Sequence, residues 1–591
     1  MGGIFGYVGK GDCKQRIVRG LKSLRYRGAE MSGAAFRIGD DILSVKVRGG
    51  TENLSEKIVT DADCHTALAQ TCDANRTKAS NLMAPPSANN LFAVCMDGII
   101  SNFDVLKSRC NNPFPILTDE DLFLAMLCIG DERDRLALLK KVISVTDSRP
   151  TVAFVAANEE AIYCHTGVMP LVIGIADDGV MLSSDIVSLI GIAKKYAVLS
   201  TGDFARLTKD KVTVIDSKGK KAKRTLLPCP NETYAESDYE LRDEIYYCPL
   251  VAKETYNALT KGDKINFDYI KLSKRYVGSL KRVIITADRD SCCAAGSAAE
   301  NFKRMTDVPV YFSDCDSVAD CDCIVDKNTL IVAVSHRGES VEILSALGYA
   351  HSCGARIVLI TGNRLSAAAR IADDVINTKC DFGREKLSLR SFFAEYISLC
   401  FFGLYFGKKC DVVSDLYQNV ALKMAEMMPG KIASAVKICP QFPTASKNMV
   451  SSERLIFTGY GIDYFLAREA AEKFSTVAGF DAVAEKLNYI EKQYIFDSKK
   501  NTLVIAILTD RDKIQKSLFF LSRLKAIGAD ILIFTTANGE QEINDFDNVI
   551  SFNDSVPLFD PLSVVAGCYK MAVAIAEEKI RAAEIQPDQS A

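Results

Sequence analysis

The sequence of 591 residues has no marked excess of charge of either sign, only four histidines and no long uninterrupted apolar run. The near balance of 72 basic and 75 acidic residues argues against a nucleic-acid track or a patch for anionic membranes. The densest cysteine cluster, Cys315, Cys321 and Cys323, lacks paired Cys-x-x-Cys spacing and a nearby histidine, so we expect no zinc site. The apolar stretch 392–406 is too short to span a bilayer and contains Glu395, which predicts a buried helix.

The first residues also lack the basic region and apolar core of a secretory signal, because they are rich in glycine and strand-like. We therefore expect a cytoplasmic protein whose twenty cysteines are reduced thiols packed as small apolar side chains. The chain is too long for one hydrophobic core, so three to four units of roughly 150–200 residues are expected.

Two segments of the C-terminal half repeat each other at an offset of about 173 residues. Their apolar runs lie at 282–286, 328–334 and 354–361 in the first copy, and at 454–458, 501–507 and 528–535 in the second. Such runs, alternating with helical patterns, indicate strands buried on both faces, hence a parallel sheet between helices. We predict two tandem doubly wound α/β domains, which bind ligands at the carboxyl ends of their strands.

The preceding part of the chain has a different pattern, in which short strands alternate with turns. Strands are expected at 35–38, 41–47, 91–96, 151–155, 170–174 and 211–215, and helices only at about 14–25 and 119–129. This pattern predicts an antiparallel α+β domain. Pro228, Pro230 and the polar stretch 231–238 indicate a linker after it.

The clearest ligand-binding signal directly follows the strand expected at 329–334. It reads Ser335-His336-Arg337-Gly338-Glu339-Ser340. A loop of small residues before a helix aims backbone N–H groups and hydroxyls at an anion on the helix N-terminus. An ordinary strand-to-helix turn capped by serine explains the same residues, and both interpretations stay open. The equivalent loop of the second copy carries Asp510 and Asp512, whose carboxylates would repel a phosphate.

Several motifs together point to one family. The opening Gly2-Gly3-Ile4-Phe5-Gly6-Tyr7 differs from Cys-Gly-Ile-Phe-Gly-Tyr only at its first residue, segment 20–28 fits Gly-Leu-x-x-Leu-x-Tyr-Arg-Gly, and segment 98–102 fits Gly-Ile-Ile-x-Asn. The Ser335 loop stands where the family has Ser-Gln-Ser-Gly-Glu-Thr. Over nearly its full length the chain resembles the glutamine–fructose-6-phosphate aminotransferases, also called glucosamine-6-phosphate synthases.

This resemblance implies a fold and a division into domains. The expected fold is an α+β glutaminase-like domain of the N-terminal nucleophile type followed by two doubly wound sugar isomerase (SIS) domains. The expected boundaries are 1–235 for the glutaminase-like domain, 236–265 for a linker, 266–420 for the first SIS domain and 440–580 for the second. In the family, the first domain releases ammonia, and the others use it on fructose 6-phosphate.

The residues that the resemblance assigns to glutaminase chemistry are changed. His65-Thr66-Ala67-Leu68-Ala69-Gln70 stands where the family has His-Thr-Arg-Trp-Ala-Thr. The nucleophilic cysteine falls on Gly2, the arginine that grips the glutamine carboxylate falls on Ala67, and the oxyanion-hole asparagine falls on Asp97, although Gly98 is kept. Glycine has no thiolate to attack an amide, and a carboxylate repels a developing oxyanion. We expect no glutaminase activity.

The isomerase motifs are also altered. The family's Cys-Gly-Thr-Ser loop falls on Asp288-Arg289-Asp290-Ser291, which keeps only the serine. The Lys-x-x-Glu motif falls on Lys473 and Thr476, and threonine cannot act as a base near neutral pH. Lys473 is either a kept site residue or a salt-bridged helix residue. Glu485 or Glu491 could replace the missing base, although both are out of register.

Two functional hypotheses follow. In the first, a family member without synthase activity binds a hexose phosphate such as fructose 6-phosphate and acts as a regulator or as the partner of an active paralogue. Its binding residues would be Ser335, His336, Arg337, Gly338, Ser340 and Ser291. In the second, the chain is an ammonia-dependent or altered sugar-phosphate isomerase, or the ordinary synthase. The resemblance implies a homodimer; no metal, cofactor, nucleic acid or membrane partner is expected.

Overall fold

The computed structural model describes residues 2–58, 64–73, 79–110, 115–130, 132–167, 169–230, 244–262, 264–320, 323–380, 388–437, 442–497, 501–552 and 558–585. The chain divides into two compact units, Met1–Glu236 and Ser237–Ala591. The polar stretch 231–238 that indicates a linker lies outside the described residues.

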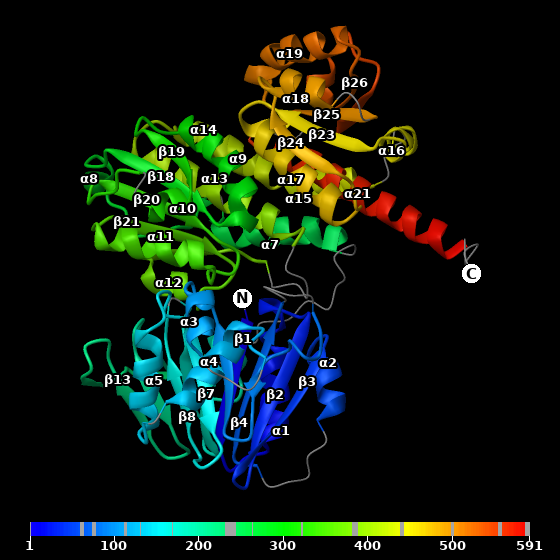
Figure 1. Cartoon of the computed structure of the whole chain (residues 1–591). Helices are drawn as coiled ribbons and strands as arrows, with labels where there is room; N and C mark the ends of the chain where they lie inside the picture. Colours follow the sequence, from blue (N-terminus) through cyan, green and yellow to red (C-terminus); the bar gives the residue numbers. More distant parts are fainter. Residues whose placement is uncertain are drawn as a thin grey trace. The chain divides into compact units, whose positions relative to one another are not determined.

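The first unit contains two antiparallel sheets that lie face to face (Figure 1). The strands of one sheet follow the order β15 (Leu227–Pro228), β11 (Lys195–Val198), β9 (Val172–Ile175), β10 (Gly179–Ser183), β1 (Gly2–Gly9), β4 (Thr66–Cys72), β2 (Met31–Ile38) and β3 (Asp41–Arg48). Those of the other follow the order β14 (Lys221–Ala222), β13 (Val212–Ile215), β12 (Phe204–Leu207), β8 (Ile162–His165), β7 (Thr151–Ala156), β6 (Phe92–Asp97) and β5 (Ser87–Ala88). The predicted antiparallel α+β architecture is confirmed.

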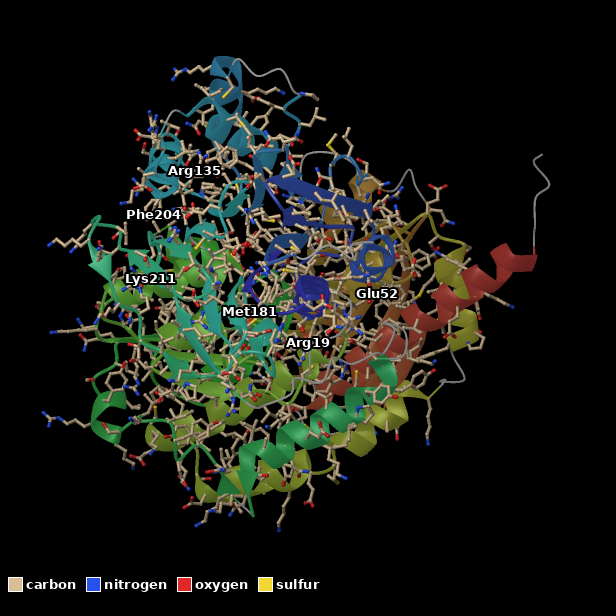
Figure 2. The ribbon with its side chains drawn as sticks, turned by 90° about the horizontal axis from the view of Figure 1, so that it is seen from below. Arg19, Glu52, Arg135, Met181, Phe204 and Lys211 are labelled. Atoms are coloured by element: carbon tan, nitrogen blue, oxygen red, sulfur yellow. The ribbon has the colours of Figure 1, made fainter. Side chains whose placement is uncertain are left out.

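Helices cover the outer face of each sheet, which makes four layers. Successive residues of β1 point to opposite faces: Ile4 and Val8 pack between the sheets, and Phe5 and Tyr7 pack against helix α1 (Cys13–Lys22). Arg19 of α1 and Glu52 of α2 (Thr51–Lys57) are labelled in Figure 2. The other sheet is covered by α3 (Phe103–Arg109), α4 (Asp119–Ile129) and α5 (Arg135–Ser144). The expectation of helices only near 14–25 and 119–129 was wrong, because α2, α3 and α5 are also present.

The second unit contains two parallel sheets with the same strand order. The first runs β19 (Val310–Asp314), β18 (Arg282–Ala287), β20 (Thr329–Val334), β21 (Arg356–Thr361) and β22 (Asp374–Asn377). The second runs β24 (Ala482–Lys486), β23 (Arg454–Gly459), β25 (Thr502–Leu508), β26 (Asp530–Thr536) and β27 (Val549–Phe552). The matching order confirms the duplication and the two doubly wound α/β domains inferred from the apolar runs.

Each sheet packs on its outer face against its own helices and on its inner face against a hydrophobic core that both sheets share. The outer face of the first sheet packs on α10 (Cys315–Ala319), α11 (Val341–Ser352) and α12 (Ala367–Ile371). The outer face of the second sheet packs on α18 (Ile490–Asp497) and α19 (Ile514–Ala526). Between the sheets lies one continuous hydrophobic core formed by α7 (Cys248–Leu259), α9 (Cys292–Lys303), α13 (Ser391–Lys409), α14 (Asp415–Ala425), α15 (Met428–Val436), α16 (Phe442–Val450), α17 (Ile462–Thr476) and α21 (Asp560–Ile585).

Helix α13 contains the apolar stretch 392–406, and it is a buried core helix as predicted. Among the residues that the structure describes, no helix is both long and apolar enough to cross a membrane. The segment 236–265, expected to be a linker, includes helix α7, whose Cys248 and Ala252 lie in the core of the second unit.

Candidate functional site

The Ser335 loop, residues 335–340, joins β20 to α11 in the first parallel sheet. Ser340 caps α11, since its side chain accepts a hydrogen bond from the backbone N–H of Ile343. Gly338 has φ = 67°, and a Cβ there would lie 2.3 Å from Ser366 Oγ. The loop therefore requires glycine both for its backbone conformation and for its close approach to Ser366.

The two hydroxyls of this loop converge on a single carboxylate oxygen. Ser335 Oγ donates to Asp288 Oδ2 at 2.5 Å, and Ser340 Oγ donates to the same oxygen at 3.1 Å. Ser335 Oγ also accepts from the backbone N–H of Gly338 at 2.9 Å. Asp288 follows β18, the strand beside β20, so the topology brings both segments to the carboxyl edge of the sheet. The loop thus has the geometry of an anion site, and it holds a carboxylate of the same chain.

The Asp288 carboxyl sits in a poorly hydrated environment. Burial, opposed by the hydrogen bond from Ser335 and reinforced by the nearby charge of Asp290, raises the pKa of Asp288 to about 6. The second oxygen, Oδ1, is buried and finds no hydrogen-bond partner among the described residues. Two serine hydroxyls thus stabilise a carboxylate that its surroundings otherwise disfavour.

A second buried carboxyl, Glu395 of α13, lies beside the loop. Ser291 Oγ donates to Glu395 Oε1 at 3.0 Å and accepts from the backbone N–H of His336 at 3.2 Å. His336 Nδ1 lies 4.0 Å from the same Glu395 oxygen. Burial, with the charge of Asp288, raises the pKa of Glu395 well above its usual value. The structure therefore brings together Ser291, Ser335, His336, Gly338 and Ser340, all predicted, with Arg337 half-buried in the same loop.

Sequence reasoning missed the part that Glu395 takes in this cluster. Its one signal was a lone carboxyl within a strongly apolar helix, which was used only to argue against a membrane span. A buried carboxyl needs hydrogen-bond partners or a proton. A lone acid in a buried helix therefore predicts a polar side chain beside it.

The equivalent loop of the second copy is also held by an internal carboxylate. Asp463 Oδ1 accepts from the backbone N–H of Thr509 at 2.9 Å and from Thr509 Oγ1 at 2.5 Å, and its Oδ2 accepts from the N–H of Asp510 at 3.3 Å. Burial raises the pKa of Asp463 to about 7. Asp510 pairs with Arg304, directly after α9, with both oxygens 2.7–2.9 Å from the guanidinium.

The residues at the Lys-x-x-Glu motif have structural contacts. Lys473 is 4% exposed, and its Nζ lies 3.2 Å from Glu469 Oε1, an oxygen that also accepts from the Tyr569 hydroxyl. Burial alone would lower the pKa of Lys473, but the Glu469 and Glu472 carboxylates raise it above its usual value. Thr476 is exposed at the end of α17 and donates to the Glu472 carbonyl. Of the two carboxylates named as replacements, Glu491 pairs with Arg523 at 2.8 Å.

In the first unit, the space beside Gly2 is occupied. A Cβ on Gly2 would lie 2.7 Å from Gln70 Nε2 and 3.1 Å from the Thr71 carbonyl oxygen. Gln70 is held in place, because its Nε2 donates to the Met96 carbonyl at 2.7 Å and its Oε1 accepts from the Met96 N–H at 2.9 Å. Sequence reasoning missed this role of Gln70. Ala67 lies on the same strand, fully buried.

The residue at the oxyanion-hole position takes part in a buried ion pair. Asp97 Oδ1 accepts from the backbone N–H of Gly2 at 3.0 Å, and its Oδ2 lies 3.1 Å from Arg27 Nη2. Arg27 Nε also donates to the Gly2 carbonyl at 3.3 Å. Gly98, which follows Asp97, has φ = 126°, a conformation that favours glycine. Asp97 therefore anchors the first strand in place of an amide donor.

Comparison with known proteins shows which proteins this chain is similar to. The SIS domain model matches residues 279–397, which contain the Ser335 loop. The glutamine–fructose-6-phosphate aminotransferase (isomerizing) of Clostridium acetobutylicum is 24% identical, over 98% of this chain and 97% of its own length. That of Francisella tularensis is 25% identical, over 93% and 92%. The chain is a relative of these aminotransferases.

The aminotransferase likeness extends to a solved structure of the second unit's fold. The C-terminal domain of glucosamine-fructose-6-phosphate aminotransferase from Francisella tularensis matches with a TM-score of 0.53 at 21% identity. The match covers 58% of this chain and 98% of that domain. This match shows the fold of the second unit, and the full-length sequence similarity together with the SIS domain model supports a glucosamine-6-phosphate synthase-like protein.

Proposed function

We propose that this synthase-like chain has lost both catalytic activities of its relatives and binds a hexose phosphate, acting as a regulator or as the partner of an active paralogue. The observation that carries the proposal is the convergence of Ser335 and Ser340 on one anionic oxygen, 2.5 and 3.1 Å away. Two hydroxyl donors for an anion are present, whereas the nucleophile and the base are absent from the positions where the family resemblance puts them.

The loss of glutaminase activity is supported at three positions. Gly2 offers no thiol, Gln70 fills the space beside it, and Asp97 is committed to Arg27. Cys72, paired with Gly2 across β1 and β4, is no substitute, because burial raises its pKa to about 12 and keeps the thiol protonated. Amide attack requires a thiolate.

The loss of isomerase activity is supported by the state of α17. Thr476 is exposed and hydrogen-bonded to its own helix, and Lys473 is neutralised by Glu469. Proton transfer between sugar carbons needs a base near neutral pH. Neither side chain supplies one.

Binding of fructose 6-phosphate can be measured by titration calorimetry. Ser335→Ala removes one of the two hydroxyl donors, so we expect affinity to fall at least about tenfold, the effect of losing a hydrogen bond to a charged group. Ser352→Ala is the matched control, since Ser352 is exposed at the far end of α11 and donates to the Tyr349 carbonyl. Equal binding by wild type and Ser335→Ala, or no binding by wild type, would contradict the proposal.

Pairing with a second copy is proposed on the family resemblance and on helix α14. Leu416 and Val420, one helical turn apart on α14, are 75% and 42% exposed. Apolar side chains at such spacing are typical of a helix face that packs against another surface. Sedimentation velocity should give a dimer for wild type and a monomer for Leu416→Lys/Val420→Lys; a monomeric wild type would contradict homodimerisation.

A second candidate function, an altered sugar-phosphate isomerase, is favoured by Glu395. This carboxyl is 1% exposed, lies beside the Ser335 loop and has a pKa raised well above its usual value by burial, as the pKa of a general acid or base often is. Aldose–ketose interconversion of hexose 6-phosphates, lost in Glu395→Gln, would establish it. No interconversion by wild type would exclude it.

A further inference from the structure

We infer that Asp288 is an internal competitor at the Ser335 loop, so that a phosphate group binds there only by displacing this carboxylate. The inference deepens the proposed function and rests on it. It makes Asp288 the residue that determines how strongly the loop accepts an external anion.

The carboxylate and a phosphate compete for the hydrogen bonds that the loop can donate. A hydroxyl has one hydrogen to donate, and Ser335 and Ser340 both donate theirs to Asp288 Oδ2. A phosphate oxygen in the same place needs the same two hydrogens. The Asp288 carboxylate and a phosphate therefore cannot both accept these hydrogen bonds at the same time.

Charge adds to the competition. A phosphate monoester at the loop would bring a negative charge next to Asp288, with Asp290 on the same segment and Glu395 facing the site from α13. The thiol of Cys315, on α10, also faces Asp288. Like charges that approach closely disfavour each other, so the Asp288 side chain must move away from the loop when phosphate binds.

The second copy supports the same interpretation independently. There Asp463, in the first turn of α17 after β23, accepts hydrogen bonds from the N–H and hydroxyl of Thr509 and from the N–H of Asp510. Both loops after the third strand in sheet order thus hold a carboxylate from the segment after the adjacent strand. An internal carboxylate therefore holds this loop in both copies, although Asp288 directly follows β18 and Asp463 lies within α17.

The test titrates fructose 6-phosphate, and inorganic phosphate as the anion alone, into wild type, Asp288→Ser and Asp290→Ser. Ser at position 288 frees both hydroxyls, so we expect binding at least about tenfold tighter than in wild type. Asp290→Ser changes the net charge equally but leaves both hydroxyls bonded to Asp288, so it should bind within about threefold of wild type. Asp288→Asn, which keeps the side-chain shape without its charge, should also bind more tightly and serves if Asp288→Ser fails to fold.

The outcomes separate the inference from the proposed function. Equal affinity of wild type and both Asp288 variants overturns the inference and leaves the proposed function standing. Tight binding by Asp288→Ser with none by wild type upholds the inference and overturns the proposed function. No binding by any variant overturns both, and equal tightening in Asp290→Ser overturns the inference in favour of a general charge effect.

Discussion

Gln70 occupies the space that a side chain at position 2 would need, with its Nε2 only 2.7 Å from the place of a Cβ on Gly2. The Gln70 amide is fixed by two hydrogen bonds to the backbone of Met96 on the neighbouring sheet. A side chain at position 2 would therefore need Gln70 to move. We expect that a cysteine introduced at position 2 alone does not create a working glutaminase site.

We expect Gly2→Cys to lower the free energy of unfolding by about 1–3 kcal/mol, as overpacking of a filled core does. Gly2→Cys/Gln70→Thr, which places the family's threonine beside the new cysteine, should regain part of this loss. Chemical denaturation of both variants measures the effect. A Gly2→Cys variant as stable as wild type would show that the space is not filled.

Removal of the Asp97 carboxylate should be costly, because the buried Arg27 guanidinium would lose the negative charge that it pairs with. The side chains of Arg27 and Asp97 are 4% and 1% exposed, and breaking such a pair costs about 3–5 kcal/mol. Asp177→Ala is the control, since the Asp177–Lys194 pair is exposed and should contribute less than about 1 kcal/mol. Equal losses of stability in the two variants would contradict this account of Asp97.

Gly338 and Gly348 provide a matched pair of substitutions around the same helix. Gly338→Ala places a Cβ 2.3 Å from Ser366 Oγ at φ = 67°, so it should destabilise the protein by more than about 1 kcal/mol and weaken phosphate binding. Gly348 lies exposed within α11 with nothing within 4 Å of a Cβ, so Gly348→Ala should stabilise by about 0.5–1 kcal/mol. Thermal unfolding measures both. The reverse order of stabilities would contradict the assigned loop geometry.

The raised pKa of Asp463, about 7, predicts a pH dependence of stability. Between the usual aspartate range near 4 and about 7, the folded protein binds this proton more tightly than the unfolded chain does. The stabilising contribution is therefore complete at acidic pH and is lost as the pH rises through 7. The stability of wild type relative to Asp463→Asn, from urea unfolding, should fall between pH 5 and pH 8. A difference independent of pH would contradict the assignment.

Much of the fold could be predicted from local patterns. The apolar runs at 282–286 and 454–458 became β18 and β23, because strands buried on both faces carry β-branched residues without interruption. Helices α2, α3 and α5 were missed. The first two have only seven residues each, too few for a clear helical period.

The candidate site could be predicted in outline from topology. The segments after two neighbouring parallel strands meet at one sheet edge, so the Ser335 loop was expected there. The bond from Ser291 to Glu395 joins residues 104 positions apart, and it depends on how α13 packs across the core. The filling of the Gly2 site by Gln70 depends on a side-chain conformation that the sequence pattern does not specify.

The central claim, that the fold persists without its chemistry, is tested most directly by assaying the purified full-length chain for glucosamine 6-phosphate formation from fructose 6-phosphate. Product is measured first with glutamine and then with ammonia as the nitrogen source. The account predicts no product above the protein-free reaction with either source. Turnover with glutamine would contradict both losses of activity, and turnover with ammonia alone would contradict the loss in the SIS domains.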